Sequence, residues 1–179
     1  AMVLSAEDHA ARAALRARQG GGARYDAEGA PSNDLLLARR ATAFFARKLN
    51  ELDDLALCPP ADVPVQRTRA HIVAKVGYDA RRLALDLEPL CPGSSHLPPE
   101  SLTEELPSLD LAVTLPARAL RYLFQHAAIH LDVCWRDLPA SAWDVQITVD
   151  GTRMIYVRDL PRLRAIDLWR QVLALDCGA

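Results

Sequence analysis

Apolar residues recur at helical spacing through most of the chain. Near the C-terminus, Leu168, Val172 and Leu175 are four and three residues apart, which places them on one face of a helix. Glycines and prolines interrupt this pattern at intervals, and helices tend to end at such residues. The pattern predicts one short N-terminal helix and four longer helices, over residues 5–19, 33–52, 65–87, 117–136 and 163–176.

One stretch between the last two helices has a different period. Val145, Ile147 and Val149 alternate with polar residues, as expected of a half-buried strand. Asp150 and Gly151 follow directly, and this pair favours a tight hairpin turn because both residue types tolerate positive φ. The sequence therefore predicts a small β-hairpin between the third and fourth long helices.

These elements predict an all-α fold, a four-helix bundle with one β-hairpin between helices 3 and 4. No internal repeat divides the chain, and 179 residues suffice for one domain with a substantial core. We expect an N-terminal helix and loop extension over residues 1–32 and the bundle domain over residues 33–179. Residues 92–116, rich in proline, serine and glutamate, are expected to connect the second and third long helices.

Composition and charge narrow the classes of partner. Half of the residues are apolar, a quarter are charged and the formal net charge is −2. This balance gives no electrostatic reason to expect nucleic acid or an anionic membrane as a partner. No apolar run reaches the roughly 18–20 residues that a membrane span needs. We therefore expect a small-molecule substrate as the partner, and a monomer or homodimer.

The four cysteines are isolated from one another, at Cys58, Cys91, Cys134 and Cys177. None of them forms the C-x-x-C spacing of structural zinc sites and thioredoxin-like motifs. Isolated cysteines in an alanine- and leucine-rich chain are typical of reduced proteins, so we expect a cytoplasmic location.

The helix predicted over residues 117–136 carries His126 and His130 one turn apart, so both rings can face one point. Three interpretations are open. The histidines can fill the bundle while bonded to the backbone or to acidic neighbours. They can contact a ligand or transfer a proton. They can also hold a metal ion together with Asp167.

Polar residues form a stripe on the helix predicted over residues 65–87. His71, Lys75, Tyr78 and Arg82 share this stripe because they are three or four residues apart. On the last helix, the polar set is placed opposite the apolar side: Arg164, Asp167, Arg170 and Gln171. The two stripes are either solvated faces or the walls of a cleft.

Three segments carry a family resemblance: AHIVAKVGYDA at residues 70–80, HLDVCWRDLP at 130–139 and IDLWRQV at 166–172. With their surroundings, over residues 22–176, they resemble the thiol-dependent (mycothiol-type) maleylpyruvate isomerase family. The resemblance implies a DinB-like four-helix bundle. Members of that family typically bind a divalent metal through a histidine on the second helix, and through a glutamate and a histidine four residues apart on the last helix.

In this sequence, the three ligand positions of the family fall on Lys75, Asp167 and Gln171. A protonated lysine has no lone pair for a metal, and glutamine is a poor ligand for transition metals. The resemblance therefore implies a bundle in which the usual metal is not expected. Lys75 is expected either to pair with Asp167, with Gln171 beside that pair, or to bind a substrate carboxylate.

We therefore predict a divergent enzyme of this family that acts on a small carboxylated or thiol-conjugated substrate. The candidate catalytic residues are Lys75, Asp167, Gln171, His126 and His130, and the candidate substrate-binding residues are His71, Tyr78 and Arg82. The candidate cofactor is a low-molecular-weight thiol, glutathione or mycothiol, because the family's chemistry adds a thiolate to a double bond, rotates the resulting single bond and eliminates the thiolate.

Two alternative functions stay open. One is a non-catalytic small-molecule-binding or accessory protein on the same bundle. The other is an ordinary metal- and thiol-dependent cis–trans isomerase, in which a bound ion favours the thiolate or polarises a carbonyl.

Overall fold

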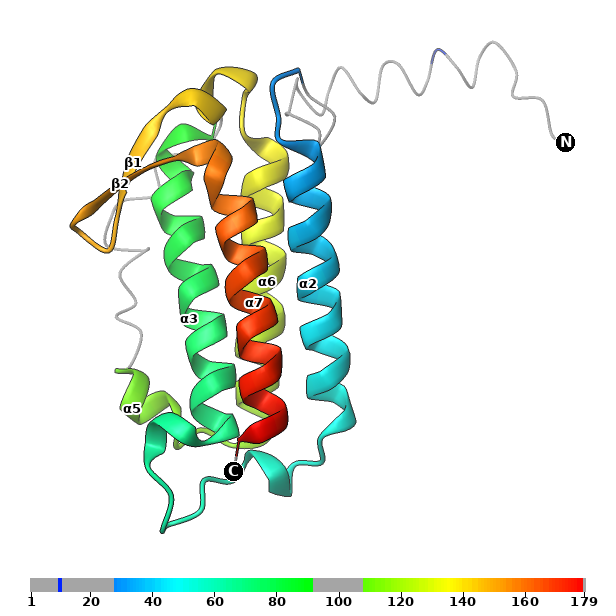
Figure 1. The fold of residues 1–179 in the computed structure, drawn as a ribbon, viewed down its shortest axis with the longest axis vertical. Coiled ribbons are helices and arrows are strands. Elements are labelled where there is room, and N and C mark those ends of the chain that lie inside the picture. Colours follow the sequence, from blue (N-terminus) through cyan, green and yellow to red (C-terminus); the bar gives the residue numbers. More distant parts are fainter. Residues whose placement is uncertain (1–9, 11–27, 92–107, 179) are drawn as a thin grey trace, which may run out of the picture.

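The structure is a computed structural model, and it describes residues 10, 28–91 and 108–178. Four long helices lie side by side in it: α2 (Ser32–Glu51), α3 (Arg69–Leu87), α6 (Ala117–Asp137) and α7 (Leu160–Cys177) (Figure 1). Strands β1 (Gln146–Val149) and β2 (Arg153–Tyr156) form an antiparallel hairpin between α6 and α7. The predicted all-α four-helix bundle with its hairpin between the third and fourth helices is confirmed. The helix predicted over residues 5–19 falls outside the described residues except at Ala10, which is helical.

Two helix starts differ from the prediction. The helix expected from residue 65 begins at Arg69, because Thr68 is extended and its Oγ1 accepts a hydrogen bond from the His71 backbone N–H at 3.2 Å. The helix expected from residue 163 begins at Leu160, with Pro161 in its first turn, where a missing N–H leaves no hydrogen bond unmade.

Shorter elements join the long helices. α5 (Leu109–Ala112) is one turn capped by Ser108, whose Oγ accepts a hydrogen bond from the Leu111 N–H at 3.3 Å. A single turn is too short to show helical periodicity, so the sequence predicted only a connection there. Short 3₁₀ helices are also present, at Leu55–Leu57, Val65–Arg67, Glu88–Leu90, Ala140–Asp144 and Val157–Asp159.

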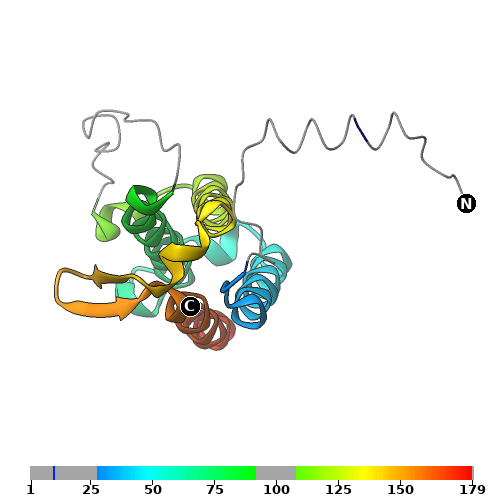
Figure 2. The same cartoon turned by 90° about the horizontal axis from the view of Figure 1, so that it is seen from above.

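The bundle consists of two closely packed helix pairs. α3 packs mainly on α6, and α2 packs mainly on α7. The view from above shows these pairs side by side, with the hairpin projecting beyond α3 and α7 (Figure 2). At the α3–α6 interface, a Cβ added to Gly77 would meet Leu123 Cγ at 3.1 Å, so the two helices approach closely there. The seams between the pairs, α3–α7 and α2–α6, have fewer contacts.

The apolar faces of the helices meet in one core. On α6, Leu120, Phe124, Ala127 and Leu131 are all buried, at spacings of four, three and four residues. Burial of a large apolar side chain of this kind stabilises a fold by about 1.5–3 kcal/mol. Among the described residues, no helix is both long enough and apolar enough to span a membrane.

The hairpin turn has the conformation that its sequence favours. Asp150 and Gly151 have φ values of 54° and 69°, and Thr152 N–H donates to Val149 O at 3.3 Å. Positive φ at both central residues gives the turn the twist of the flanking strands. Asp150 also pairs with Arg82 of α3, so the hairpin is attached to the bundle at the α3–α7 seam.

Candidate functional site

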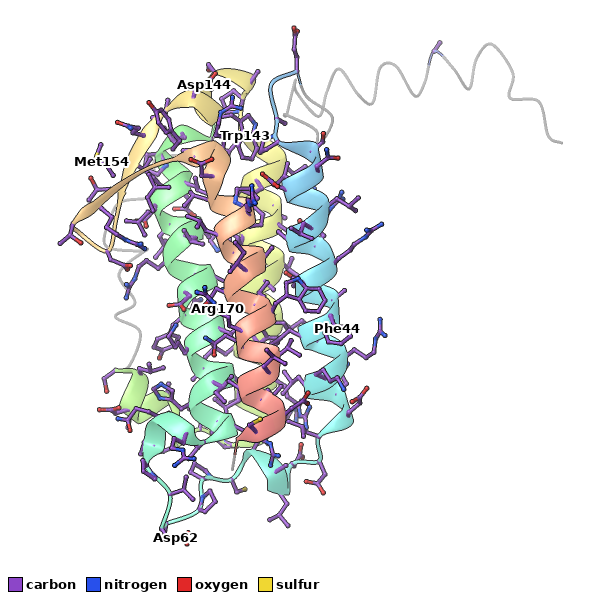
Figure 3. All side chains as sticks on the ribbon, viewed as in Figure 1. Phe44, Asp62, Trp143, Asp144, Met154 and Arg170 are labelled. Carbon is purple, nitrogen blue, oxygen red and sulfur yellow. The ribbon has the colours of Figure 1, made fainter. Side chains whose placement is uncertain are left out.

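A cleft of about 330 Å³ lies where the hairpin meets α3 and α7; we call it the charged cleft. The charged side chains that line it are Lys75, Asp79 and Arg82 from α3, Asp150 and Arg153 from the hairpin, and Arg164, Asp167 and Arg170 from α7. Five of them are cationic and three are acidic, so the described residues give the lining a formal excess of two positive charges. Figure 3 shows the side chain of Arg170 between α7 and α3.

Ion pairs within the cleft already involve two of its cations. Lys75 Nζ donates to Asp79 Oδ2 at 2.6 Å, one turn along α3. Arg82 Nη1 donates to Asp150 Oδ1 at 2.5 Å. In the described part of the chain, three arginines of the cleft have no carboxylate within ion-pair distance: Arg153, Arg164 and Arg170.

Arg164 is the most unusual of these arginines because its side chain is buried. It is 4% exposed, and its Nη2 donates to the Val76 carbonyl of α3 at 3.1 Å. Its Nη1 is buried as well and has no hydrogen-bond partner among the described residues. Burial lowers the pKa of the guanidinium, and the charges of Asp79 and Asp167 act in the opposite direction.

The prediction that Arg164 lies opposite the apolar side of the last helix is wrong. Arg164 precedes Leu168 by four residues and Val172 by eight, so it shares the buried face of α7 with them. That spacing was visible in the sequence. The spacing predicts a buried position, whereas the residue type predicts an exposed one, because arginine is rarely found fully buried.

The cleft brings together some of the predicted site residues. Lys75, Arg82 and Asp167 all line it. Gln171 lies one turn after Asp167, and its Nε2 donates to Asp167 Oδ1 at 3.4 Å. The ion-pair partner of Lys75 in the structure is Asp79, not Asp167 as expected.

Two further predicted residues of α3 do not line the cleft. His71 is half-buried, and its Nδ1 has no hydrogen-bond partner among the described residues. Burial lowers the His71 pKa and Lys75 adds to this effect, while Asp110 opposes it. Tyr78 packs against the core, and burial raises its pKa against an opposing effect of Arg81.

The two histidines of α6 also lie outside the charged cleft. His126 is exposed and its ring stacks on Tyr122, with a centroid distance of 5.6 Å. His130 Nε2 lies 3.2 Å from Glu88 Oε1, which fits the interpretation of a histidine bonded to an acidic neighbour. Within the described residues, no three His, Cys, Asp or Glu side chains gather as a metal site, so these histidines do not form one with Asp167.

The donor set formed by Lys75, Asp167 and Gln171 does not fit a divalent transition metal. The Lys75 ammonium donates to Asp79, and an ammonium has no lone pair for a metal. Asp167 accepts a hydrogen bond from Gln171. The only groups of these three residues that could bind a metal are therefore the Asp167 carboxylate and the Gln171 amide oxygen. Zinc and similar ions prefer imidazole, thiolate and several carboxylates.

None of the four cysteines lines the charged cleft. Cys134 is buried, and burial raises its pKa to about 12, with Cys91 and Glu88 adding to the shift. Burial also raises the pKa of Cys91. Because the thiolate is the nucleophilic form, the raised pKa values make Cys91 and Cys134 poor nucleophiles at neutral pH.

No protein-family model matches this sequence, and a search of curated proteins finds no match. Two crystal structures are similar to it: the mycothiol-dependent maleylpyruvate isomerase, and a histidine-to-alanine mutant of that protein. Each match has a TM-score of 0.65 and 26% sequence identity, and covers 83% of this chain and 62% of the other. The chain thus spans less than two thirds of that isomerase, and the comparison supports an isomerase-like helical fold.

Proposed function

We propose that this chain is a divergent enzyme of the maleylpyruvate isomerase type that binds a small carboxylated or thiol-conjugated substrate in the charged cleft. One observation carries the proposal: the cleft contains three arginines without a carboxylate partner among the described residues, and one of them is buried. Arginine forms bidentate pairs with carboxylates, so a substrate with one or two carboxylates fits these groups. The structural similarity to the mycothiol-dependent isomerase supports the class of chemistry.

The nucleophile in this proposal comes from outside the chain, because no cysteine lines the cleft. A low-molecular-weight thiol, mycothiol or glutathione, adds its sulfur to a cis double bond conjugated with a carbonyl. The electron pair of that double bond moves to the carbonyl oxygen as an enolate, and the new single bond rotates. The enolate then restores the double bond in the trans form and expels the thiolate. The cationic lining favours both the thiolate and the enolate.

We further propose that the reaction needs no metal ion. The resemblance implies that Lys75 replaces one of the family's metal ligands. In the structure, Lys75 pairs with Asp79, which holds its ammonium at the cleft wall. A fixed ammonium can stabilise developing negative charge, although it cannot ligate a metal.

A second candidate function is a non-catalytic protein that binds the same class of anion. Among the described residues, the lining of the charged cleft contains neither histidine nor cysteine. It therefore lacks the side chains whose unperturbed pKa values suit proton transfer or nucleophilic attack near neutral pH. Such a lining suits ligand binding at least as well as catalysis.

Binding can be tested with maleate as a small dicarboxylate probe, by isothermal titration calorimetry. Arg170→Gln should weaken maleate binding by about 10-fold or more, because it removes a charge-assisted hydrogen bond. Arg162→Gln is the matched control, since Arg162 is an exposed arginine of the same helix outside the cleft. Absence of maleate binding, or equal losses in both variants, would contradict the proposed site.

Turnover separates the two candidate functions. Maleylpyruvate is incubated with the protein and either mycothiol or glutathione, and formation of fumarylpyruvate is followed by NMR. We expect turnover that requires the thiol and survives a metal chelator. Lys75→Met should lower kcat/KM by about 10-fold or more, while Lys48→Met, which alters an exposed pair with Glu51, should have no effect. Binding without turnover supports the second candidate, and loss of activity with chelator contradicts the metal-free reaction.

A further inference from the structure

A second cavity, of about 370 Å³, lies between α2 and α6; we call it the apolar cavity. In the view from above, the α2–α6 seam lies on the side of the bundle away from the hairpin and the α3–α7 seam (Figure 2). The function proposed above does not use this cavity.

The walls of the apolar cavity suit a hydrocarbon body. Phe124, Leu131 and Trp135 of α6 are each less than 5% exposed, and they line the cavity together with Ala43 of α2. Thr42 offers no free hydroxyl proton, because its Oγ1 donates to the Ala38 carbonyl at 2.8 Å. A flat aromatic or branched aliphatic group would replace water against these walls at a favourable free energy.

Two buried donors of this cavity have no acceptor. The Trp135 indole Nε1 and the Arg164 Nη1 are both buried without a hydrogen-bond partner among the described residues. The two side chains are 3% and 4% exposed, and both line the apolar cavity. Buried donors are normally paired, so two orphaned donors at one cavity point to an acceptor that the protein itself does not supply.

We propose that the apolar cavity binds a small amphipathic carboxylate, whose apolar body packs on Phe124 and Trp135. Its carboxylate oxygens accept hydrogen bonds from Arg164 and the Trp135 indole. The formal charge of the described lining favours an anionic ligand, because it includes two arginines, Arg39 and Arg164, and one acidic side chain, Asp132. A neutral hydrocarbon would leave both donors unpaired, and a cation would be repelled by Arg164.

Arg164 lines both the charged cleft and the apolar cavity. A variant of Arg164 would therefore affect both sites and could not distinguish them. Trp135 lines only the apolar cavity of the two, and Arg170 lines only the charged cleft. These two residues allow the sites to be tested separately.

The test titrates 3-phenylpropionate into the full-length protein and compares it with 3-phenylpropanamide, its neutral counterpart, by isothermal titration calorimetry. The carboxylate should bind about 10-fold more tightly, because its charge strengthens the hydrogen bonds from Arg164 and Trp135. Equal affinity for the two probes, or no binding of either, would overturn the proposal.

Trp135→Phe removes the indole N–H and keeps an aromatic wall. It should weaken 3-phenylpropionate binding by about 5-fold, the size expected for one hydrogen bond. Trp143→Phe is the matched control: Trp143 is also a buried tryptophan with an unpartnered Nε1, but it does not line this cavity. Equal losses in the two variants would contradict the site. If Trp135→Phe fails to fold, Ala43→Leu should block the cavity from the α2 side and abolish binding.

The results of this binding test can be distinguished from those of the maleate test of the charged cleft. Maleate affinity should be unchanged in Trp135→Phe, and 3-phenylpropionate affinity should be unchanged in Arg170→Gln. If 3-phenylpropionate loses affinity in Arg170→Gln but not in Trp135→Phe, it binds in the charged cleft and the second site is refuted. If maleate fails to bind while 3-phenylpropionate behaves as described, the second site stands without the proposed function.

Discussion

The α3–α7 and α2–α6 seams separate the same two helix pairs, yet their side chains differ in kind. Charged residues line much of the α3–α7 seam, which the hairpin borders. Alanine and large apolar residues line much of the α2–α6 seam, which the hairpin does not reach. Each of the two seams has a cavity, of about 330 Å³ and 370 Å³, and the residues on the facing helices decide what each cavity can bind.

Arg164 links the two seams because its side chain lies in the interior and lines both cavities. A buried guanidinium is expensive to desolvate, and Arg164 makes one side-chain hydrogen bond to the residues that the structure describes. If the proposed anion binds there, its charge would offset part of this cost, because it would pair with the guanidinium.

The largest expected effect comes from Arg164→Met, which replaces the buried cation by an apolar side chain of similar length. Maleate affinity should fall by about 10-fold or more, since charged hydrogen bonds are lost. The free energy of unfolding should rise by about 1–3 kcal/mol, because the desolvation cost disappears. Urea denaturation and calorimetric titration measure the two effects.

Arg162→Met, an exposed position on the same helix, is the control for this substitution and should change neither quantity by much. A fall in the stability of Arg164→Met would show instead that the hydrogen bond to Val76 contributes to holding α3 and α7 together.

A new leucine should have different effects at the tight α3–α6 interface and at the more open α2–α6 seam. Gly77→Leu should destabilise the protein by about 1–3 kcal/mol through overpacking, although leucine is the better helix former, because Leu123 Cγ lies 3.1 Å from the new Cβ. Ala43→Leu enters the apolar cavity and should change stability by less than about 0.5 kcal/mol. Thermal or urea denaturation of the two variants and the wild type measures these changes in stability. Equal effects would mean that the α2–α6 seam is as tightly packed as the α3–α6 interface.

The smallest expected effect concerns His71, which lies on α3 outside both cavities. Its pKa in the folded state is lowered from 6.5 by burial, so the unfolded chain binds the proton first as the pH falls. Stability should therefore be full above pH 6.5 and decline from there until the pH is below the folded pKa. Because Asp86, whose pKa burial raises, acts in the opposite direction, the comparison with His71→Gln isolates the histidine.

The measurement for His71 is the free energy of unfolding of both proteins between about pH 7.5 and pH 5. The wild type should lose more stability than His71→Gln over this interval. Parallel curves for the two proteins would show that the His71 ring is hydrated in the folded state as it is in the unfolded chain.

Much of the fold could be predicted from local sequence. The spacing of Leu168, Val172 and Leu175 gave the buried face of α7, and Asp150 with Gly151 gave the hairpin turn. The start of α3 was missed because the prediction extended the helix through Thr68, whose hydroxyl caps it. These features depend on backbone geometry over a few residues, which neighbouring residue types largely set.

The candidate site could be predicted only in part. Lys75, Arg82 and Asp167 were placed on facing stripes, and they do line one cleft. Helical projection could not choose between Asp79 and Asp167 as the partner of Lys75, because that choice depends on the distance between α3 and α7. Helical projection also gave no indication that His126 lies outside the cleft. In the structure, the His126 ring stacks on Tyr122 at the surface.

The sequence by itself determined where the helices and the hairpin form and which face of each helix is apolar, because these properties repeat within a few residues. The tertiary structure decided that Arg164 is buried with no ion-pair partner among residues 28–91 and 108–178, and that it lines two separate cavities. Such features depend on how closely helices distant in the chain approach one another, and side-chain volumes summed over the whole core set that approach.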